Sequence, residues 1–160
     1  TEGNMSKSLK RVQAHMAELG LVCEIMHVTV PTNTAQQAAD AIGCDLDQIV
    51  KSVIFRGEQS MQAILFLTAG GNRVDVSAAS KLAGELLGKA DADLVRAQTG
   101  FAIGGVAPIG HLNPIRAFID PRLMAFPQIW AAAGTPHHMF DIAPELLVEK
   151  TGAIVAAFTE

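Results

Sequence analysis

Two apolar runs separated by a short polar stretch constrain the fold of this 160-residue chain more than any other feature. The runs are VIF at 53–55 and AILFL at 63–67, and the polar residues RGEQ follow the first of them. This arrangement predicts a β-hairpin. Because neither run alternates with polar residues, both strands are expected near the centre of a sheet, buried on two faces.

Helical and extended patterns alternate around this hairpin. Apolar residues at three- and four-residue spacing predict helices at 8–19, 34–42, 76–88, 91–99, 120–126 and 143–151. Strands are expected at 21–28, 115–120 and 153–158, with two more around a Gly-Thr-Pro turn within 129–142. Thr34 and Gln37 form a capping-box pattern, and Ser77 is the expected cap of the third helix. We therefore expect an α+β fold: a single domain with a mixed, largely antiparallel β-sheet or partial barrel surrounded by helices, rather than a doubly wound parallel sheet.

Composition supports one domain, which we assign to residues 6–160. Hydrophobic residues make up 49% of the chain and charged residues 18%, enough for a sizeable core. Residues 1–5 show no pattern and are expected to be a disordered N-terminus or a remnant of cloning. No apolar stretch approaches the roughly 20 residues of a membrane span, so we expect a cytoplasmic protein with no membrane partner. Cys23 and Cys44 lack zinc-site spacing, and the net charge of −4 argues against broad, non-specific duplex binding.

The segment GFAIGGVAPIG at 100–110 contains no charged residue. Any ligand held there would meet backbone N–H groups, and the adjacent Gly104 and Gly105 would let these groups approach a carbonyl or oxyanion unobstructed by a Cβ atom. The alternative is a tight connection in which the glycines only permit positive φ. A dinucleotide-binding fingerprint is excluded, because the glycines lack GxGxxG spacing and no helix follows them. We predict that Gly104 and Gly105 are catalytic through their backbone.

Lys51 is the second candidate, because it is flanked by the apolar residues Ile49, Val50, Val53 and Ile54. If its side chain points inward, it needs an anionic partner such as a phosphate or a carboxylate. The alternative is that the ammonium group reaches solvent at the entrance of the strand. No GxSxG motif is present, so a serine nucleophile is not expected.

Four segments together resemble the YbaK-type editing domain, a family that includes the domain inserted in bacterial prolyl-tRNA synthetases and its free-standing relatives. They are TAQQAADAIG at 34–43, IVKSVIF at 49–55, TGFAIGGVAPIGH at 99–111 and AAAGTPHHMFDI at 131–142. The resemblance covers about residues 8–157. It implies hydrolysis of the ester of a mischarged aminoacyl-tRNA, without a metal ion or other cofactor.

The resemblance also implies roles for single residues in the lysine segment and the glycine segment. Lys51 corresponds to the family's essential lysine, and Gly104, Gly105 and Pro108 to its glycine–proline loop. Lys51 would hold the acceptor end of the tRNA through a phosphate or the ribose. The attacking water would be positioned with help from a ribose hydroxyl of the terminal adenosine.

Four further residues are candidates for contact with the substrate, three of them through the resemblance. Thr34 precedes the alanine-rich helix, Asp141 is the acidic residue of a late strand, and His27 lies near the rim of the pocket. Adjacent strand residues point to opposite faces, so only one of His137 and His138 can face the pocket, and His138 is our candidate. A His–Asp general base is the lesser alternative.

Two functions remain open at this stage. The first is a free-standing deacylase that acts in trans on mischarged tRNA, with alanyl-tRNA for proline as the expected substrate and a cognate synthetase as a further partner. Such an enzyme is needed because a missing methylene changes binding by only about 1–3 kcal/mol, so a synthetase pocket cannot strongly reject a smaller amino acid. The second is a non-catalytic module that binds a tRNA acceptor stem or a synthetase. In either case, we expect the pocket size to depend on apolar side chains such as Met26, Ile64, Phe66 and Phe101.

Overall fold

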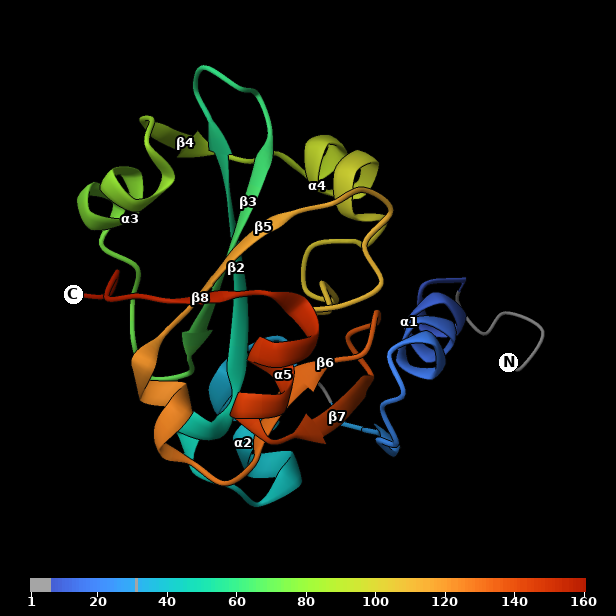
Figure 1. Ribbon diagram of the computed structural model, residues 1–160. Helices are drawn as coiled ribbons and strands as arrows, with labels where there is room; N and C mark the ends of the chain where they lie inside the picture. Colours follow the sequence, from blue (N-terminus) through green and yellow to red (C-terminus); the bar gives the residue numbers. More distant parts are fainter. Residues whose placement is uncertain (1–6, 31) are drawn as a thin grey trace.

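The computed structural model describes residues 7–30 and 32–160 (Figure 1). The prediction for residues 1–5 concerns a part of the chain outside these ranges. A five-stranded sheet in the order β4-β2-β3-β5-β8 forms the centre of the molecule. Its strands are β2 (Val50–Gly57), β3 (Ala63–Ala69), β4 (Leu87–Lys89), β5 (Arg116–Ile119) and β8 (Ile154–Val155). β2 is antiparallel to β3 and β4, whereas β5 runs parallel to both of its neighbours.

The predicted hairpin is present, with pairs running from Val50 opposite Ala69 to Arg56 opposite Ala63. Every residue of β3 is buried, as expected for a central strand. The prediction that the first strand is buried on both faces was wrong, because residues 51–56 of β2 are only half-buried. The reason is that β4 pairs only with residues 55–57 of β2. In the described structure, the rest of this edge has no strand partner between Ile49, which bridges Trp130, and Phe55.

A second, three-stranded sheet has the order β1-β7-β6 and is antiparallel throughout. It consists of β1 (Ile25–His27), β6 (Ile129–Ala132) and β7 (His138–Ile142). The last two are the predicted short strands around the Gly-Thr-Pro turn. The bridge between Ile49 and Trp130 joins the two sheets. The two sheets do not close into a barrel. Most strand pairs are antiparallel and two are parallel, so the expectation of a mixed, largely antiparallel α+β fold is confirmed.

Five α-helices and two short 3-10 helices accompany the sheets in the described residues. They are α1 (Lys7–Glu18), α2 (Ala35–Ile42), α3 (Val76–Ala83), α4 (Ala92–Thr99), α5 (Pro144–Thr151), η2 (Leu46–Gln48) and η3 (Pro121–Ala125). The capping box of α2 is confirmed, with the Thr34 hydroxyl accepting a bond from the Gln37 amide. The predicted cap of α3 was wrong: Asp75, not Ser77, accepts the first amides. The α3 helix also ends early, at Gly84 with φ of +81°, which leaves room for β4.

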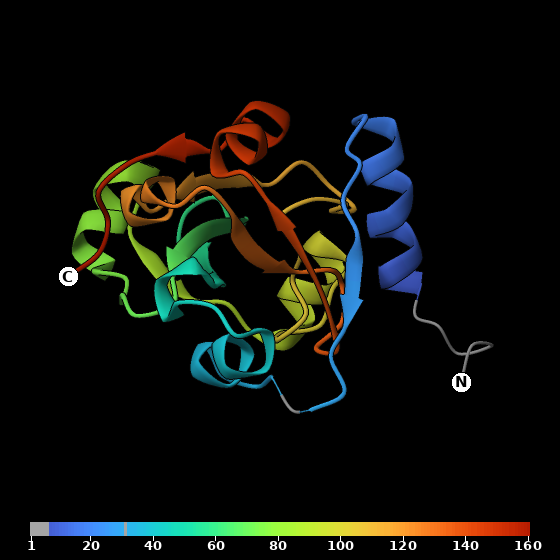
Figure 2. The ribbon, with the colours of Figure 1, turned by 90° about the horizontal axis from the view of Figure 1, so that it is seen from below.

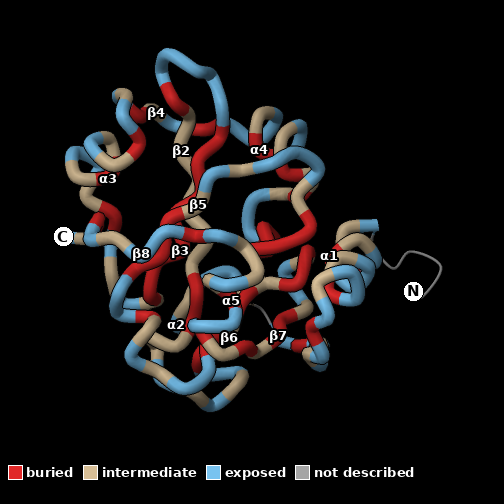
Figure 3. Tube along the Cα trace, viewed as in Figure 1, coloured by how far each residue is buried: buried red, intermediate tan, exposed pale blue. Residues whose placement is uncertain are grey.

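The helices lie around the sheets, with α1 and α3 at opposite ends of the molecule (Figures 1 and 2). The buried residues concentrate along the central strands, and the exposed residues lie on the outer helices and loops (Figure 3). The largest core cluster joins α1 to β3 and to the glycine segment through Val12, Leu65, Phe101 and Ile109. Across residues 7–30 and 32–160, no helix combines the length and apolar character that a membrane crossing requires.

Candidate active site

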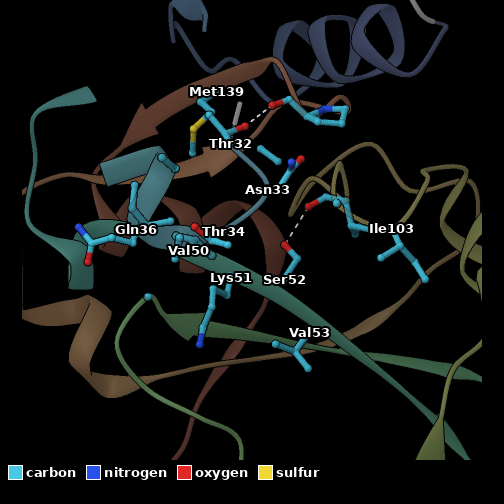
Figure 4. A pocket seen from close by; sticks show the side chains of 18 of the residues that line it. Thr32, Asn33, Thr34, Gln36, Val50, Lys51, Ser52, Val53, Ile103 and Met139 are labelled. Carbon is cyan, nitrogen blue, oxygen red and sulfur yellow. Dashed lines mark hydrogen bonds between the residues drawn. The ribbon is translucent and has the colours of Figure 1, made fainter. Parts of the chain in front are cut away.

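A cavity of about 570 Å³ lies along the unpaired edge of β2 (Figure 4). Its walls come from five stretches of the chain: 32–38, 46–53, Gly70, 103–106 and 132–139. Four consecutive residues of β2, from Val50 to Val53, contribute to it. Lys51 and Ser52 point to opposite sides of the strand (Figure 4), so the cavity is bordered by both faces of β2 near its edge.

Lys51 is held on one side of this edge by a polar network. Its Nζ donates a hydrogen bond to the carbonyl oxygen of Asn72. The Asn72 side chain donates in turn to the carboxylate of Asp120 at 2.9 Å. Asp120 is 2% exposed and also accepts the amides of Ala69 and Arg122. Lys51 therefore lines the cavity with its ammonium group anchored to backbone.

Burial lowers the pKa of the Lys51 ammonium, and the nearby positive charge of Arg73 lowers this pKa further. The carboxylates of Asp47 and Asp120 act in the opposite direction. The Lys51 side chain is half-buried, so neither of the two simple orientations considered from the sequence describes it. An anion entering the cavity would find a partly desolvated cation, which binds anions more strongly than a fully hydrated one.

The glycine segment forms the opposite wall, fixed to β2 by a 2.8 Å bond from the Ser52 hydroxyl to the carbonyl of Val106. Gly104 is exposed with φ of +95°, and a Cβ atom there would meet open space. Among the described residues, no acceptor pairs with the Gly104 amide. An unpaired amide at the cavity wall can serve as a donor to a carbonyl oxygen or an oxyanion.

Gly105 has a different role, because it is buried behind Gly104. Its amide donates to the carbonyl of Ala102 at 3.0 Å, so that donor is engaged in a turn. A Cβ atom at Gly105 would lie 3.0 Å from Cα of Thr135 and 3.1 Å from the carbonyl oxygen of Gly134. The absence of a side chain at 105 therefore permits a close approach between two backbones.

One of the threonines that line the cavity, Thr135, is connected to two histidines. Thr34 lines the cavity at the start of α2, and Thr135 lines it at the turn before β7. The Thr135 hydroxyl lies 2.7 Å from Nδ1 of His138. The His138 ring stacks on that of His27 with centroids 4.9 Å apart. Burial lowers the pKa of His138, with a smaller contribution from His27. Both histidines thus lie behind Thr135 rather than in the cavity wall.

Two predicted site residues lie elsewhere. Pro108 lines a separate cavity of about 380 Å³, together with His15 and His111. Asp141 pairs with Trp130 across β6 and β7 and lies near Cys23. The pKa of that thiol is raised mainly by burial and further by Asp141. Of the residues predicted for the site, the structure brings Lys51, Thr34 and Gly104 to one cavity, with Gly105 and His138 directly behind its wall.

Comparison with known proteins assigns this architecture to a family. The family model of the aminoacyl-tRNA editing domain matches residues 29–150. The chain belongs to this family. The YbaK-type resemblance of the sequence is therefore confirmed, and the matched residues include every stretch that lines the cavity.

Individual proteins similar to this chain support the same family assignment. A solved structure described provisionally as a trans-editing enzyme for prolyl-tRNA synthetase is 42% identical, with a TM-score of 0.91, over 98% of this chain and 99% of the other. YwhH of Bacillus subtilis, which has no assigned function, is 31% identical over 89% of this chain and 90% of its own length. EbsC of Enterococcus faecalis, provisionally named a Cys-tRNA(Pro)/Cys-tRNA(Cys) deacylase, is 23% identical over 79% and 77%.

The prediction of which apolar residues set the size of the pocket was wrong. Ile64, Phe66 and Phe101 are fully buried in the core, and Met26 is exposed on β1. The apolar side chains that line the cavity include Val50, Ile103 and Met139 instead. Sequence order alone does not distinguish a core side chain from a cavity side chain, since both are apolar.

Sequence reasoning also missed Ser52, Asn72, Asp120 and Thr135. Asp120 lies at the start of the helix predicted at 120–126, and it caps η3 by accepting the Arg122 amide. Its buried contact with Asn72 joins segments 48 residues apart and has no local signal. Among the described residues, no group of three or more His, Cys, Asp or Glu side chains is arranged to hold a metal ion.

Proposed function

We propose that this protein is a free-standing editing deacylase that hydrolyses the ester of mischarged aminoacyl-tRNA in trans, with alanyl-tRNA for proline as its main substrate. The observation that carries the proposal is the position of Lys51 and the Gly104 amide at one cavity along the open edge of β2. A volume of about 570 Å³ lies within the range of small-molecule sites and suits the aminoacylated end of a tRNA.

The cavity supports a mechanism that needs no side-chain nucleophile. Water attacks the ester carbonyl, and negative charge develops on the carbonyl oxygen. The amide of Gly104, which has no acceptor among the described residues, donates to that oxygen and stabilises the charge. Lys51 anchors a phosphate or the ribose of the terminal adenosine, and Thr34 and Thr135 orient the substrate. A ribose hydroxyl of the terminal adenosine helps to position the water before it attacks. When the tetrahedral intermediate collapses, the bond between the carbonyl carbon and the esterified ribose oxygen breaks. One proton of the water passes to that ribose oxygen, the other is released to solvent, and the amino acid leaves as its carboxylate. No metal ion is required.

The apolar part of the lining favours a small, uncharged amino acid. Val50, Ile103 and Met139 offer no partner for a charged side chain, which would lose its hydration on entry. Alanine fulfils this requirement. Cysteine is the second amino acid to test, because the Enterococcus relative is provisionally named for cysteinyl-tRNA.

The alternative is a module that binds tRNA or a synthetase without hydrolysis. The test is ester release from alanyl, cysteinyl, seryl and threonyl esters, each on tRNA for proline and on one other tRNA, at catalytic enzyme concentration. We expect multiple turnovers with alanyl-tRNA for proline and the same rate after treatment with a chelator. Binding of every member without turnover would support the module instead.

A further inference from the structure

We propose that Arg11, on helix α1, is a positioning residue that holds the glycine segment 100–110 in its active conformation. This inference rests on the proposed function for its kinetic consequence, but its structural basis is independent. Helix α1 precedes the residues that the family model matches and contributes no residue to the cavity wall. Its contact with the glycine segment nevertheless connects it to Gly104.

Arg11 joins both ends of the glycine segment with one guanidinium group. Its Nε donates to the carbonyl oxygen of Gly110 at 2.8 Å, and its Nη2 donates to that of Gly100 at 2.7 Å. The guanidinium carbon also lies 4.7 Å from the centroid of the Phe101 ring. A planar group with several donors in fixed directions suits such a bridge, whereas a lysine ammonium group is a point donor on a flexible chain.

The backbone is shaped to admit this group. Gly100 and Gly110 have φ of +83° and +80°, conformations that favour glycine. A Cβ atom at Gly100 would lie 2.5 Å from Nη2 of Arg11 and 2.9 Å from its Cζ. Gly100 is therefore needed for its conformation and for the space that the guanidinium group occupies.

A second contact runs from α1 to the same segment through the turn before β7. A Cβ atom at Gly134 would lie 2.8 Å from the carbonyl oxygen of Ser8, in the first turn of α1. The other side of this turn packs on Gly105, as described above. Helix α1 thus supports the glycine segment at its base through Arg11 and from behind through Gly134 and Thr135.

Loss of the guanidinium group would loosen the base of the segment without freeing it. The Ser8 hydroxyl would still donate to the carbonyl oxygen of Gly100, and Nδ1 of His15 would still accept the Gly110 amide. The apolar anchors of the segment would also remain. Phe101, Val106 and Ile109 stay in the core, so we expect the fold to survive. The Gly104 amide, close to the middle of the segment, would lose its fixed position. Displacement of a catalytic group by about 1 Å can reduce a rate about 100-fold, so the effect is expected in kcat.

The experiment compares Arg11→Met with Lys10→Met, which removes the same charge from an exposed neighbour on the same helix. We expect Arg11→Met to lower single-turnover deacylation at saturating substrate about 10- to 100-fold, with KM close to that of Lys10→Met. Lys10→Met should keep the wild-type rate. Arg11→Lys, which retains the charge and at most part of the bridge, should fall between wild type and Arg11→Met, and serves if Arg11→Met does not fold.

Hydrogen exchange provides a readout that does not depend on activity. Amides within 100–110 should exchange faster in Arg11→Met than in Lys10→Met, while those of β3 remain equally protected. Unchanged exchange in this segment would overturn the proposal, as would a loss of thermal stability with wild-type turnover in the folded fraction. If the wild-type protein hydrolyses no ester, the proposed function fails, and the exchange result still decides the role of Arg11.

Discussion

Lys51 combines a partly desolvated charge with an anchor that is not itself an anion. Its Nζ bonds to the Asn72 carbonyl, and the nearest carboxylate of that network, on Asp120, is occupied by Ala69, Asn72 and Arg122. The ammonium group therefore retains its capacity to attract an anion from the cavity. A backbone carbonyl thus holds the Lys51 side chain in place without neutralising its positive charge.

Replacement of Lys51 by methionine should remove the anchor for the substrate while preserving most of the packing. We expect deacylation to fall about 100-fold or more, a loss comparable with removal of one charge-stabilising donor in other hydrolases. The thermal midpoint should change by no more than a few degrees, because the half-buried site creates little cavity. Lys81→Met, an exposed change on α3, is the matched control. Near wild-type turnover in Lys51→Met would contradict the assignment.

His111 should make the protein sensitive to acid. Its Nε2 lies 2.7 Å from the Ala107 carbonyl oxygen. Burial lowers the pKa of His111; the hydrogen bond to Ala107 acts in the opposite direction, and the nearby charges of His15 and Arg11 lower this pKa further. The unfolded chain therefore binds this proton more readily than the folded one. The free energy of unfolding should fall as the pH drops through about 6.5 toward the folded-state pKa, by at most about 1.4 kcal/mol per pH unit.

The test is chemical denaturation of wild type and His111→Gln at several pH values from neutral to mildly acidic. Glutamine keeps a donor for the Ala107 carbonyl but does not titrate, so the variant should show the flatter profile. His138 also has a lowered pKa and should leave a residual slope in His111→Gln. Identical slopes in both proteins would mean that His111 does not titrate as we infer.

The glycine segment behaves as one element whose two central glycines have separate functions. Gly104 lines the cavity with a positive φ and an unpaired amide, and Gly105 permits close contact with the turn at 134–135. The sequence indicated a backbone-lined segment but assigned the same role to both residues. Their difference depends on Thr135, about 30 residues away, which local patterns do not include.

A methyl group at Gly104 should cost both stability and activity. The variant Gly104→Ala places a Cβ at φ of +95°, which costs roughly 1–2 kcal/mol, and adds a methyl group to a residue that lines the cavity. Gly84→Ala is the matched control, because Gly84 has φ of +81°, open space around the added methyl and a position at the end of α3. Thermal midpoints of the two variants should fall by similar amounts, whereas turnover should fall in Gly104→Ala alone. Equal turnover in both would make the segment a connector.

Helix and strand positions were predicted well where the signal is local. The capping box of α2, the β2–β3 hairpin and the strand pair around Gly134 all follow from neighbouring residues. The unpaired edge of β2 did not follow, because it depends on how far β4 extends along it. For the same reason, the local patterns identified the lysine and the glycine segment separately, and only the family resemblance assigned both to one site.

The C-terminal residues close the molecule at the end opposite α1. Phe158 is fully buried in a second core cluster, with Ile64, Phe66 and Phe118, and packs edge-on against Phe66 at 5.1 Å between centroids. Backbone bonds join Phe158 to Asp75 and Glu160 to Arg73. Arg73 directly follows Asn72, whose carbonyl oxygen accepts the hydrogen bond from Lys51. The C-terminal residues are therefore bonded to the stretch of backbone next to the one that holds Lys51.

Phe158→Ala should therefore be the most destabilising of the changes considered in this Discussion. Truncation of a fully buried phenylalanine costs about 3–5 kcal/mol, measured as the loss in free energy of unfolding by denaturant titration. Phe126→Ala, at a half-buried position on the surface end of η3, provides the comparison and should cost less. A loss in Phe158→Ala no larger than that in Phe126→Ala would contradict this prediction.

The bridge between the two sheets provides a built-in optical reporter. Trp130, which forms that bridge with Ile49, is the single tryptophan, and the chain has no tyrosine. It packs on the cluster of Ala38, Ile49 and Met139, three residues that also line the cavity. Its fluorescence thus originates directly behind the wall that a substrate would touch. Occupancy of the cavity should change the emission of unlabelled protein, so that ligands can be titrated without radioactive tRNA.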